Sequence, residues 1–164
     1  MKVDISDILI TNGASKELDL KEAPVERKLT EECFLNGDLS FCGTLTNQND
    51  VLLLEGTLET SYSSECFRCL KPLKNTMKLK IIESFVSSDN AEQSDMYVFE
   101  GKTIDLSKAI YDNIILNLPM KQLCSEECKG FCSICGANLN EVQCGCSSKE
   151  TDARLEGLNK FFES

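Results

Sequence analysis

The chain has 164 residues, 41% of them hydrophobic, a formal net charge of −10 and no histidine. The length suits one domain with a small appendage, and the acidity weighs against binding nucleic acid through the overall electrostatic field. The lack of histidine excludes Ser-His-Asp and Cys-His nucleophiles and histidine-rich catalytic zinc sites. No apolar run reaches the roughly 20 residues of a membrane span, and the first residues do not resemble a signal peptide. We therefore expect a cytoplasmic protein.

The N-terminal part of the chain predicts little regular structure. Residues 1–6 alternate apolar and polar side chains, which is typical of a half-buried strand. Residues 11–24 carry Gly13 and a mixed charged run, and we expect a connection there. Residues 25–38 are highly polar and show no clear element.

A β-rich region follows. Residues 39–46 and 52–62 alternate apolar and polar side chains on either side of the turn sequence TNQND. This pattern predicts a β-hairpin with one solvent-facing side. Pro72 marks the exit from the sequence CFRCLKP, and the alternation at residues 77–85 predicts a further strand.

The next stretch predicts a loop, a short strand and the main helix. Residues 87–95 are acidic with little to bury, which indicates a mobile loop, and residues 96–100 predict a short strand. Asp105 is a good N-cap and Pro119 stops the helix. Residues 151–162 predict a short C-terminal helix. The apolar positions of the main helix recur at helical spacing: Leu106, Ala109, Ile110, Ile114 and Leu118.

These elements predict an α+β fold. We expect an antiparallel β-sheet or partly closed barrel with one main helix, a cysteine-rich zinc module and a short C-terminal helix. The composition changes most clearly at Pro119. We therefore divide the chain into a body at residues 1–118, a cysteine-rich metal-binding module at residues 119–149 and a C-terminal helix at residues 150–164 packed on the body.

Eight of the ten cysteines are spaced like metal ligands. In a reducing cytoplasm, closely spaced cysteine pairs indicate metal binding rather than disulfides. Cys33 and Cys42 stand alone, and we expect them to be small core residues. The other eight form four pairs along the chain, in order: Cys66 and Cys69, Cys124 and Cys128, Cys132 and Cys135, Cys144 and Cys146.

By count, the four pairs make two four-sulfur sites. Joining the third pair to the fourth keeps one site local, closed by the eight-residue loop GANLNEVQ, and leaves the first pair to bind with the second. The alternative joins the second pair to the third and the first to the fourth, and the sequence leaves both open. Four thiolates suit structural Zn²⁺ and leave no open position for a catalytic water, although iron also accepts sulfur ligands.

A local basic stretch stands out in this acidic chain. Residues 66–80 contain no acid, and Lys74, Lys78 and Lys80 share the non-core face if the segment is a strand. The stretch is a candidate contact for RNA or a protein partner, and the alternative is a solvated strand face balanced by nearby acids. Its cationic residues are Arg68, Lys71, Lys74, Lys78 and Lys80.

The sequence resembles a known family. The segment CFRCLKPL, a following acidic loop, and the segment IDLSKAIYDNIILNLPMKQLCSEECKGFCSICGANLNEVQCGC are similar to the YceD family of large ribosomal RNA subunit accumulation proteins. The likeness runs from about residue 52 to the C-terminus and covers all eight clustered cysteines.

The resemblance implies a cytoplasmic, non-catalytic factor in ribosome biogenesis that supports accumulation or maturation of large-subunit ribosomal RNA. Its partner would be the large ribosomal subunit precursor or ribosomal RNA, reached directly or through another protein, with no membrane and no small-molecule substrate. The alternative from the cysteines is a thiol-based redox or metal-responsive regulator. A nuclease is not expected, because no pair of carboxylates stands out as a catalytic metal centre.

Overall fold

The computed structural model describes residues 1–23, 26–90 and 96–146. The predicted C-terminal helix lies outside these residues. The strands are β1 (Lys2–Asp4), β2 (Ser15–Glu22), β3 (Arg27–Lys28), β4 (Cys33–Leu35), β5 (Leu39–Gln48), β6 (Val51–Glu65), β7 (Pro72–Ser87), β8 (Tyr97–Phe99) and β9 (Thr103–Asp105). The helical segments are the 3-10 turn η1 (Ser88–Asn90) and the helix α1 (Ser107–Leu116).

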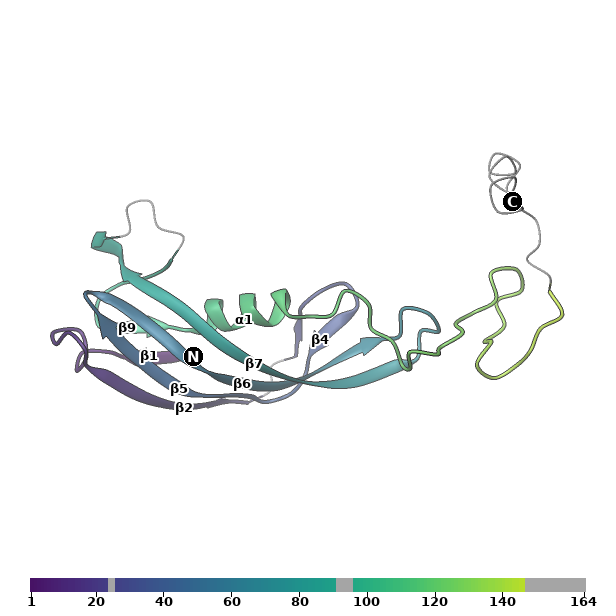
Figure 1. The fold of residues 1–164 in the computed structure, drawn as a ribbon, viewed down its shortest axis with the longest axis horizontal. Coiled ribbons are helices and arrows are strands. Elements are labelled where there is room, and N and C mark those ends of the chain that lie inside the picture. The colour runs from purple at the N-terminus through teal and green to yellow at the C-terminus, as the bar shows by residue number, and fades with distance from the viewer. Residues whose placement is uncertain (24–25, 91–95, 147–164) are drawn as a thin grey trace, which may run out of the picture.

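The hairpin of β6 and β7 is the longest feature of the fold. The two strands have 15 and 16 residues and pair antiparallel from Val51 opposite Val86 to Glu65 opposite Pro72. Their side chains alternate between the core and the outer face, as the sequence predicts. The hairpin runs along the molecule and ends at the cysteine-rich segment, away from the rest of the sheet (Figure 1).

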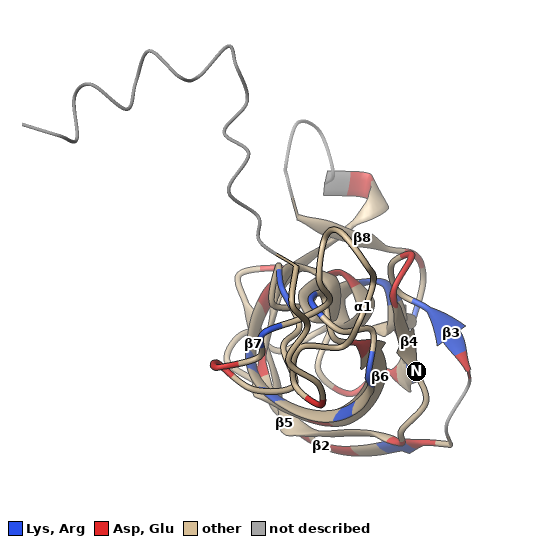
Figure 2. Ribbon diagram, turned by 90° about the vertical axis from the view of Figure 1, so that its right-hand side faces the viewer, with Lys and Arg blue, Asp and Glu red and all other residues tan. Residues whose placement is uncertain are grey.

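The sheet is mostly antiparallel and curves around α1. Strands β2, β5, β6, β4 and β3 follow one another, and β7 pairs with β6 on its other side. Seen from the cysteine-rich end, the strands wrap around the helix (Figure 2). The predicted α+β fold, an antiparallel sheet or partly closed barrel with one main helix, is confirmed for the described residues. An exception to the antiparallel pattern is β8, which pairs parallel with β7.

One core fills the space between the sheet and the helix. Most of its fully buried side chains come from the predicted apolar faces of the strands and from the predicted inner face of α1. Leu35 of β4 and Ile104 of β9 are exceptions, because the sequence predicts no strand at either position. The largest of the fully buried side chains are Phe41, Phe85, Ile5, Leu35, Leu45, Leu52, Leu54, Leu58, Ile81, Ile104, Leu106 and Ile110.

The predicted turn between β5 and β6 is confirmed. Asn49 and Asp50 have φ angles of 53° and 67°, which suit the twist of a two-residue hairpin loop. The buried amide of Asn47 donates to the carbonyl oxygens of Ile8 and Leu9 at 2.9 and 3.1 Å. This amide ties the turn to the N-terminal segment.

Two predictions for the N-terminal part need correction. The connection expected at residues 11–24 is wrong, because β2 pairs with β5 along its whole length. Only Leu18 of β2 is buried, so this polar edge strand depends on backbone pairing and shows little apolar signal. Residues 25–38, which carry no clear pattern, contain β3 and β4, and these pair with each other.

The main helix differs from prediction only in detail. Leu106, and not the predicted Asp105, occupies the N-cap position. The Asp105 carboxylate still accepts a hydrogen bond from the Ser107 N–H, at 3.0 Å. The helix ends at Leu116, before Pro119. Of the mobile loop expected at residues 87–95, Ser87 ends β7, the next three residues form η1, and residues 91–95 lie outside the described residues. In the described part of the chain, no helix is long and apolar enough to cross a membrane.

We predict that Gly56→Ala destabilises the body. Gly56 lies opposite Gly43, and a Cβ at Gly56 would stand 2.5 Å from the Phe41 ring and 2.6 Å from the Cys42 carbonyl oxygen. Overpacking of this kind lowers the free energy of unfolding by about 1–3 kcal/mol, measurable by urea denaturation. The control, exposed Glu55→Ala, should stay within about 0.5 kcal/mol of wild type. Equal stability of the two variants would contradict the packing described.

Candidate metal centres

The loop that closes the β6–β7 hairpin is a tight cysteine turn, which we call the first knuckle (residues 66–71). The Cys66 N–H donates to the Lys71 carbonyl, and the Leu70 N–H donates to the Cys66 carbonyl, both at 2.9 Å. Leu70 has a φ of 54°, a left-handed backbone conformation that residues other than glycine rarely adopt. The turn brings Cys66 and Cys69 together at the hairpin tip.

A second knuckle (residues 132–137) repeats this geometry. The Cys132 N–H donates to the Ala137 carbonyl at 2.8 Å, and the Gly136 N–H donates to the Cys132 carbonyl at 2.9 Å. Gly136 has a φ of 72° and occupies the position that Leu70 holds in the first knuckle. A glycine adopts this conformation without a steric penalty. The two knuckles therefore share one backbone design.

The inner cluster joins the first knuckle to the module. Its four sulfurs, from Cys66, Cys69, Cys124 and Cys128, lie within 4.8 Å of one another. The Sγ atoms of Cys66 and Cys128 are 3.8 Å apart, and those of Cys69 and Cys124 are 3.6 Å apart. Sulfurs at the corners of a tetrahedron around Zn²⁺ would stand roughly 3.8 Å apart, given a Zn–S distance near 2.3 Å. The cluster thus has the dimensions of a four-thiolate metal site.

The outer cluster lies wholly within the module. Its sulfurs, from Cys132, Cys135, Cys144 and Cys146, also lie within 4.8 Å of one another. Two of these cysteines are exposed and two are half-buried, whereas Cys66, Cys69 and Cys128 of the inner cluster are buried. The structure thus groups the first cysteine pair with the second and the third with the fourth, and not in the alternative way.

The electrostatics of both clusters favour a bound cation. Burial opposes ionisation of Cys66, but N–H donors from Cys124, Arg68 and Cys69 outweigh it and lower its pKa to about 6. The neighbouring sulfurs of Cys128 and Cys69 raise the pKa of Cys124 to about 12. The pKa of Cys128 is also lowered despite its burial, with the Asn140 amide as a donor, whereas that of Cys69 is raised. Two thiols therefore ionise readily and the other two resist, because like charges would accumulate. A divalent cation at the centre would remove this repulsion.

The outer cluster repeats this asymmetry. N–H donors of Cys135 and Ile134 lower the pKa of Cys132 to about 6. Contact with the Cys135 sulfur raises the pKa of Cys146 to about 12. The donor set of each cluster therefore fits a thiolate-bound metal ion by distance and by charge.

Arg68 fastens the module to the first knuckle. Its guanidinium donates to the carbonyls of Cys128 at 2.7 Å and Glu126 at 3.1 Å. Its own carbonyl accepts the Phe131 N–H at 3.2 Å. Gly130 lies so close that an added Cβ would stand 2.8 Å from the Arg68 carbonyl oxygen. Arg68 thus has a structural task besides its predicted role in partner contact.

Gln122 supplies a further tie that the sequence does not signal. Its carbonyl accepts the Phe67 N–H at 2.8 Å. Its side chain lies 3.4 Å from the Tyr62 hydroxyl and 3.4 Å from the Asn75 amide. The segment before Cys124 is therefore held to both strands of the hairpin.

Asn140 links the two clusters. It belongs to the loop that closes the outer cluster, and its amide donates to the Cys128 sulfur at 3.4 Å. Its side-chain oxygen accepts the Lys129 N–H at 2.9 Å. Such partners orient metal ligands and tune them. No motif in the sequence distinguishes this asparagine from its neighbours.

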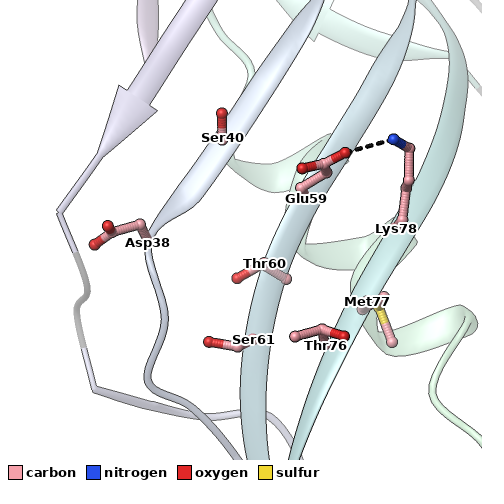
Figure 3. A pocket seen from close by; sticks show the side chains of 8 residues that line it. All are labelled: Asp38, Ser40, Glu59, Thr60, Ser61, Thr76, Met77 and Lys78. Atoms are coloured by element: carbon pink, nitrogen blue, oxygen red, sulfur yellow. Dashed lines mark ion pairs between the residues drawn. The ribbon is translucent and has the colours of Figure 1, made fainter.

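The predicted basic face is only partly basic. Lys74, Lys78 and Lys80 do share the exposed face of β7. Figure 3 shows Lys78 paired with Glu59 of β6, and this contact raises the pKa of Lys78. Asp38 lines the pocket drawn in Figure 3, which Glu59 and Lys78 also line. Among the described residues, Lys71, Lys74 and Lys80 form no ion pair and stay exposed.

The two lone cysteines behave differently. Cys33 is buried in the core, as expected. Cys42 is exposed on β5, so its assignment to the core is wrong. Cys42 follows the buried Phe41, and successive side chains of a strand point to opposite faces of the sheet, so the Cys42 side chain lies on the outer face.

We predict that Asn140→Ala weakens metal binding at the inner cluster by about 10- to 100-fold, the usual effect of losing a hydrogen bond to a metal ligand. Competition with a chromophoric chelator would measure the change. Gln143→Ala, an exposed position in the same loop, serves as the control. Equal chelator curves for both variants would show that Asn140 does not support Cys128.

Known relatives cover parts of the chain. A chloroplastic YCED homolog 1 of Arabidopsis thaliana, named a large ribosomal RNA subunit accumulation protein, is 45% identical over 64 residues, covering 39% of this chain and 20% of the relative. The homolog of the same name from Zea mays is 27% identical over 152 residues, covering 73% and 52%. An uncharacterized protein of Mycobacterium tuberculosis is 32% identical over 93 residues, covering 54% and 45%. The chain spans about half or less of the length of these relatives. No solved structure matches it.

The family comparison covers the site itself. The family model described as large ribosomal RNA subunit accumulation protein YceD matches residues 54–162, about two thirds of the chain. The match begins within β6 and includes both knuckles and all eight clustered cysteines. The resemblance in the sequence is thereby confirmed, and the chain belongs to the YceD family.

Proposed function

We propose that this protein is a non-catalytic factor in ribosome biogenesis that supports accumulation or maturation of large-subunit ribosomal RNA. The observation that carries the proposal is membership of the YceD family, whose model and two plant relatives bear that description. The protein would act in the cytoplasm by docking onto the large ribosomal subunit precursor, on ribosomal RNA directly or through another protein. No membrane and no small-molecule substrate enters this function.

We infer that each cluster holds one structural Zn²⁺. Cys66, Cys69, Cys124 and Cys128 would hold one ion, and the four cysteines of the outer cluster would hold the other. Four thiolates complete a tetrahedron and leave no place for a reactive water, so the ions would stabilise the fold. The module needs this support, because among the described residues only Leu73 and Leu123 pack against the inner cysteines.

We expect two zinc ions per chain by elemental analysis of the purified protein. Cys69→Ser and Cys144→Ser should each retain one ion, because each removes a ligand from a different cluster. Cys69→Ser should lower the melting temperature more, since the inner cluster is buried and joins two parts of the chain. Bound iron, or a loss of both ions in Cys144→Ser, would contradict the assignment.

The exposed lysines at the hairpin tip are the proposed contact with the precursor. Lys71 and Lys74 lie at and beside the first knuckle, and Lys80 lies further along β7. Lysines of this kind contact either the phosphate groups of RNA, without reading its sequence, or the carboxylates of an acidic protein surface. Lys78 contributes less, because Glu59 already neutralises it.

We predict that the combined change of Lys71, Lys74 and Lys80 to Glu lowers co-sedimentation with large-subunit precursors by at least about tenfold at low salt. A matched control reverses three exposed lysines elsewhere, Lys2, Lys21 and Lys102, and should bind nearly as wild type. The proposed function fails if the wild-type protein does not associate with precursors and ribosomal RNA levels are unchanged on its depletion.

Exposure of the outer cluster favours a second candidate, a thiol-based redox or metal-responsive regulator. Cys135 and Cys146 are exposed, and clustered thiolates release metal on oxidation. Mild peroxide separates the two candidates. A structural role predicts that zinc and precursor binding survive the treatment, whereas a regulator would lose zinc and change its binding together.

A further inference from the structure

The first knuckle carries a leucine where its backbone calls for glycine. Leu70 and Gly136 hold equivalent positions in the two knuckles, with the same hydrogen bond to the first cysteine and positive φ angles of 54° and 72°. The conformation strains a leucine and does not strain a glycine. The Leu70 side chain is 60% exposed, so burial does not offset the strain. The local fold therefore gives no reason for a leucine at this position.

Phe67 is a second large apolar side chain that the knuckle does not need. It is 57% exposed, and Ser133 occupies the equivalent position in the second knuckle. The fold uses the Phe67 backbone, whose N–H bonds to Gln122, and leaves the ring accessible. Exposed apolar side chains without a structural task indicate a binding surface.

Exposed lysines lie beside these two residues in space or in the chain. The Lys121 ammonium lies 5.7 Å from the centre of the Phe67 ring. Lys71 follows Leu70 in the chain, Lys74 lies on the adjoining stretch of β7, and all three lysines are exposed. The surface thus combines an apolar centre with a positively charged rim, which is the common layout of a protein interface.

We propose that Phe67 and Leu70 are anchors that dock into an apolar socket, rimmed by Asp and Glu, on a protein component of the large-subunit precursor. This inference rests on the proposed function and names the class of partner for the hairpin tip. The positive rim calls for an acidic partner surface. A protein suits the anchors better than RNA, because a leucine offers no ring on which a base can stack.

The tip is rigid enough for this role. The first knuckle is closed by two backbone hydrogen bonds, and the inner cluster and the Arg68 guanidinium fix it to the module. A side chain held in its binding position before contact loses little freedom on docking. The strain at Leu70 would then be a feature of the docking surface.

The second knuckle supplies the test substitutions. Leu70→Gly and Phe67→Ser each install the residue found at the equivalent position there, so both should fold and keep two zinc ions. Leu70→Gly should not lower the melting temperature, because glycine relieves the strained φ. Ile10→Ala, at a 92% exposed site outside the module, is the control. The probes are purified large-subunit precursor particles and RNA extracted from the same particles with protein removed.

We expect the full chain to co-sediment with the particles and only weakly with the protein-free RNA. Each knuckle variant should reduce association with the particles by about tenfold or more, as for the central residues of an interface, while Ile10→Ala stays within about twofold. If both knuckle variants associate with the particles as strongly as the wild-type chain does, the proposed docking surface is wrong while the proposed function still stands. If the wild-type chain binds protein-free RNA as well as it binds the particles, and Leu70→Gly loses that RNA binding, then the partner of the hairpin tip is RNA and not a protein. Failure of the wild-type chain to associate would overturn the proposed function together with this inference.

Discussion

The contact between the first knuckle and the cysteine-rich module is the constraint on which the rest of this structure depends. Cys66 and Cys69 meet Cys124 and Cys128 across more than 50 residues of chain. In the part of the chain that the structure describes, apolar packing there is slight, since only Leu73 and Leu123 pack against the buried cysteines. Four thiols at these distances repel one another once ionised, so the contact needs a cation. With a metal bound, the same four sulfurs would become the strongest link between the module and the body.

The body and the hairpin tip are stabilised in different ways. The body is held by an apolar core between the curved sheet and α1. Among the described cysteines, only Cys33 is part of this core. The β6–β7 hairpin then extends the sheet to a tip where few apolar side chains are buried (Figure 1). At the tip, the hydrogen bonds of Arg68, Gln122 and Asn140 take the place of a core, together with the metal ions that we propose for the two clusters. Exposed side chains such as Phe67 and Leu70 are thereby free for contact with a partner.

Much of this architecture follows from the sequence, and the failures have physical causes. Strands β5 to β7 and α1 are predictable because their apolar residues recur at strand and helix periods and face one core. The strand β2 is not, because only Leu18 is buried and its pairing with β5 involves backbone atoms. Spacing identifies the eight cysteines that form the two clusters but cannot decide which distant segments meet, so their grouping depends on the fold. The roles of Asn140 and Leu70 were also hidden, since one depends on a tertiary hydrogen bond and the other on a backbone angle.

The central claim is that Cys66 and Cys69 share one metal with Cys124 and Cys128 and so fasten the module to the hairpin. The most direct test replaces the native metal with cadmium-113 and records which cysteine β-protons couple to each cadmium nucleus. We expect two resonances typical of four-thiolate sites. One should couple to Cys66, Cys69, Cys124 and Cys128, and the other to the four cysteines of the outer cluster. A resonance that couples to Cys124 and Cys128 together with Cys132 and Cys135, or a single resonance, would contradict the claim.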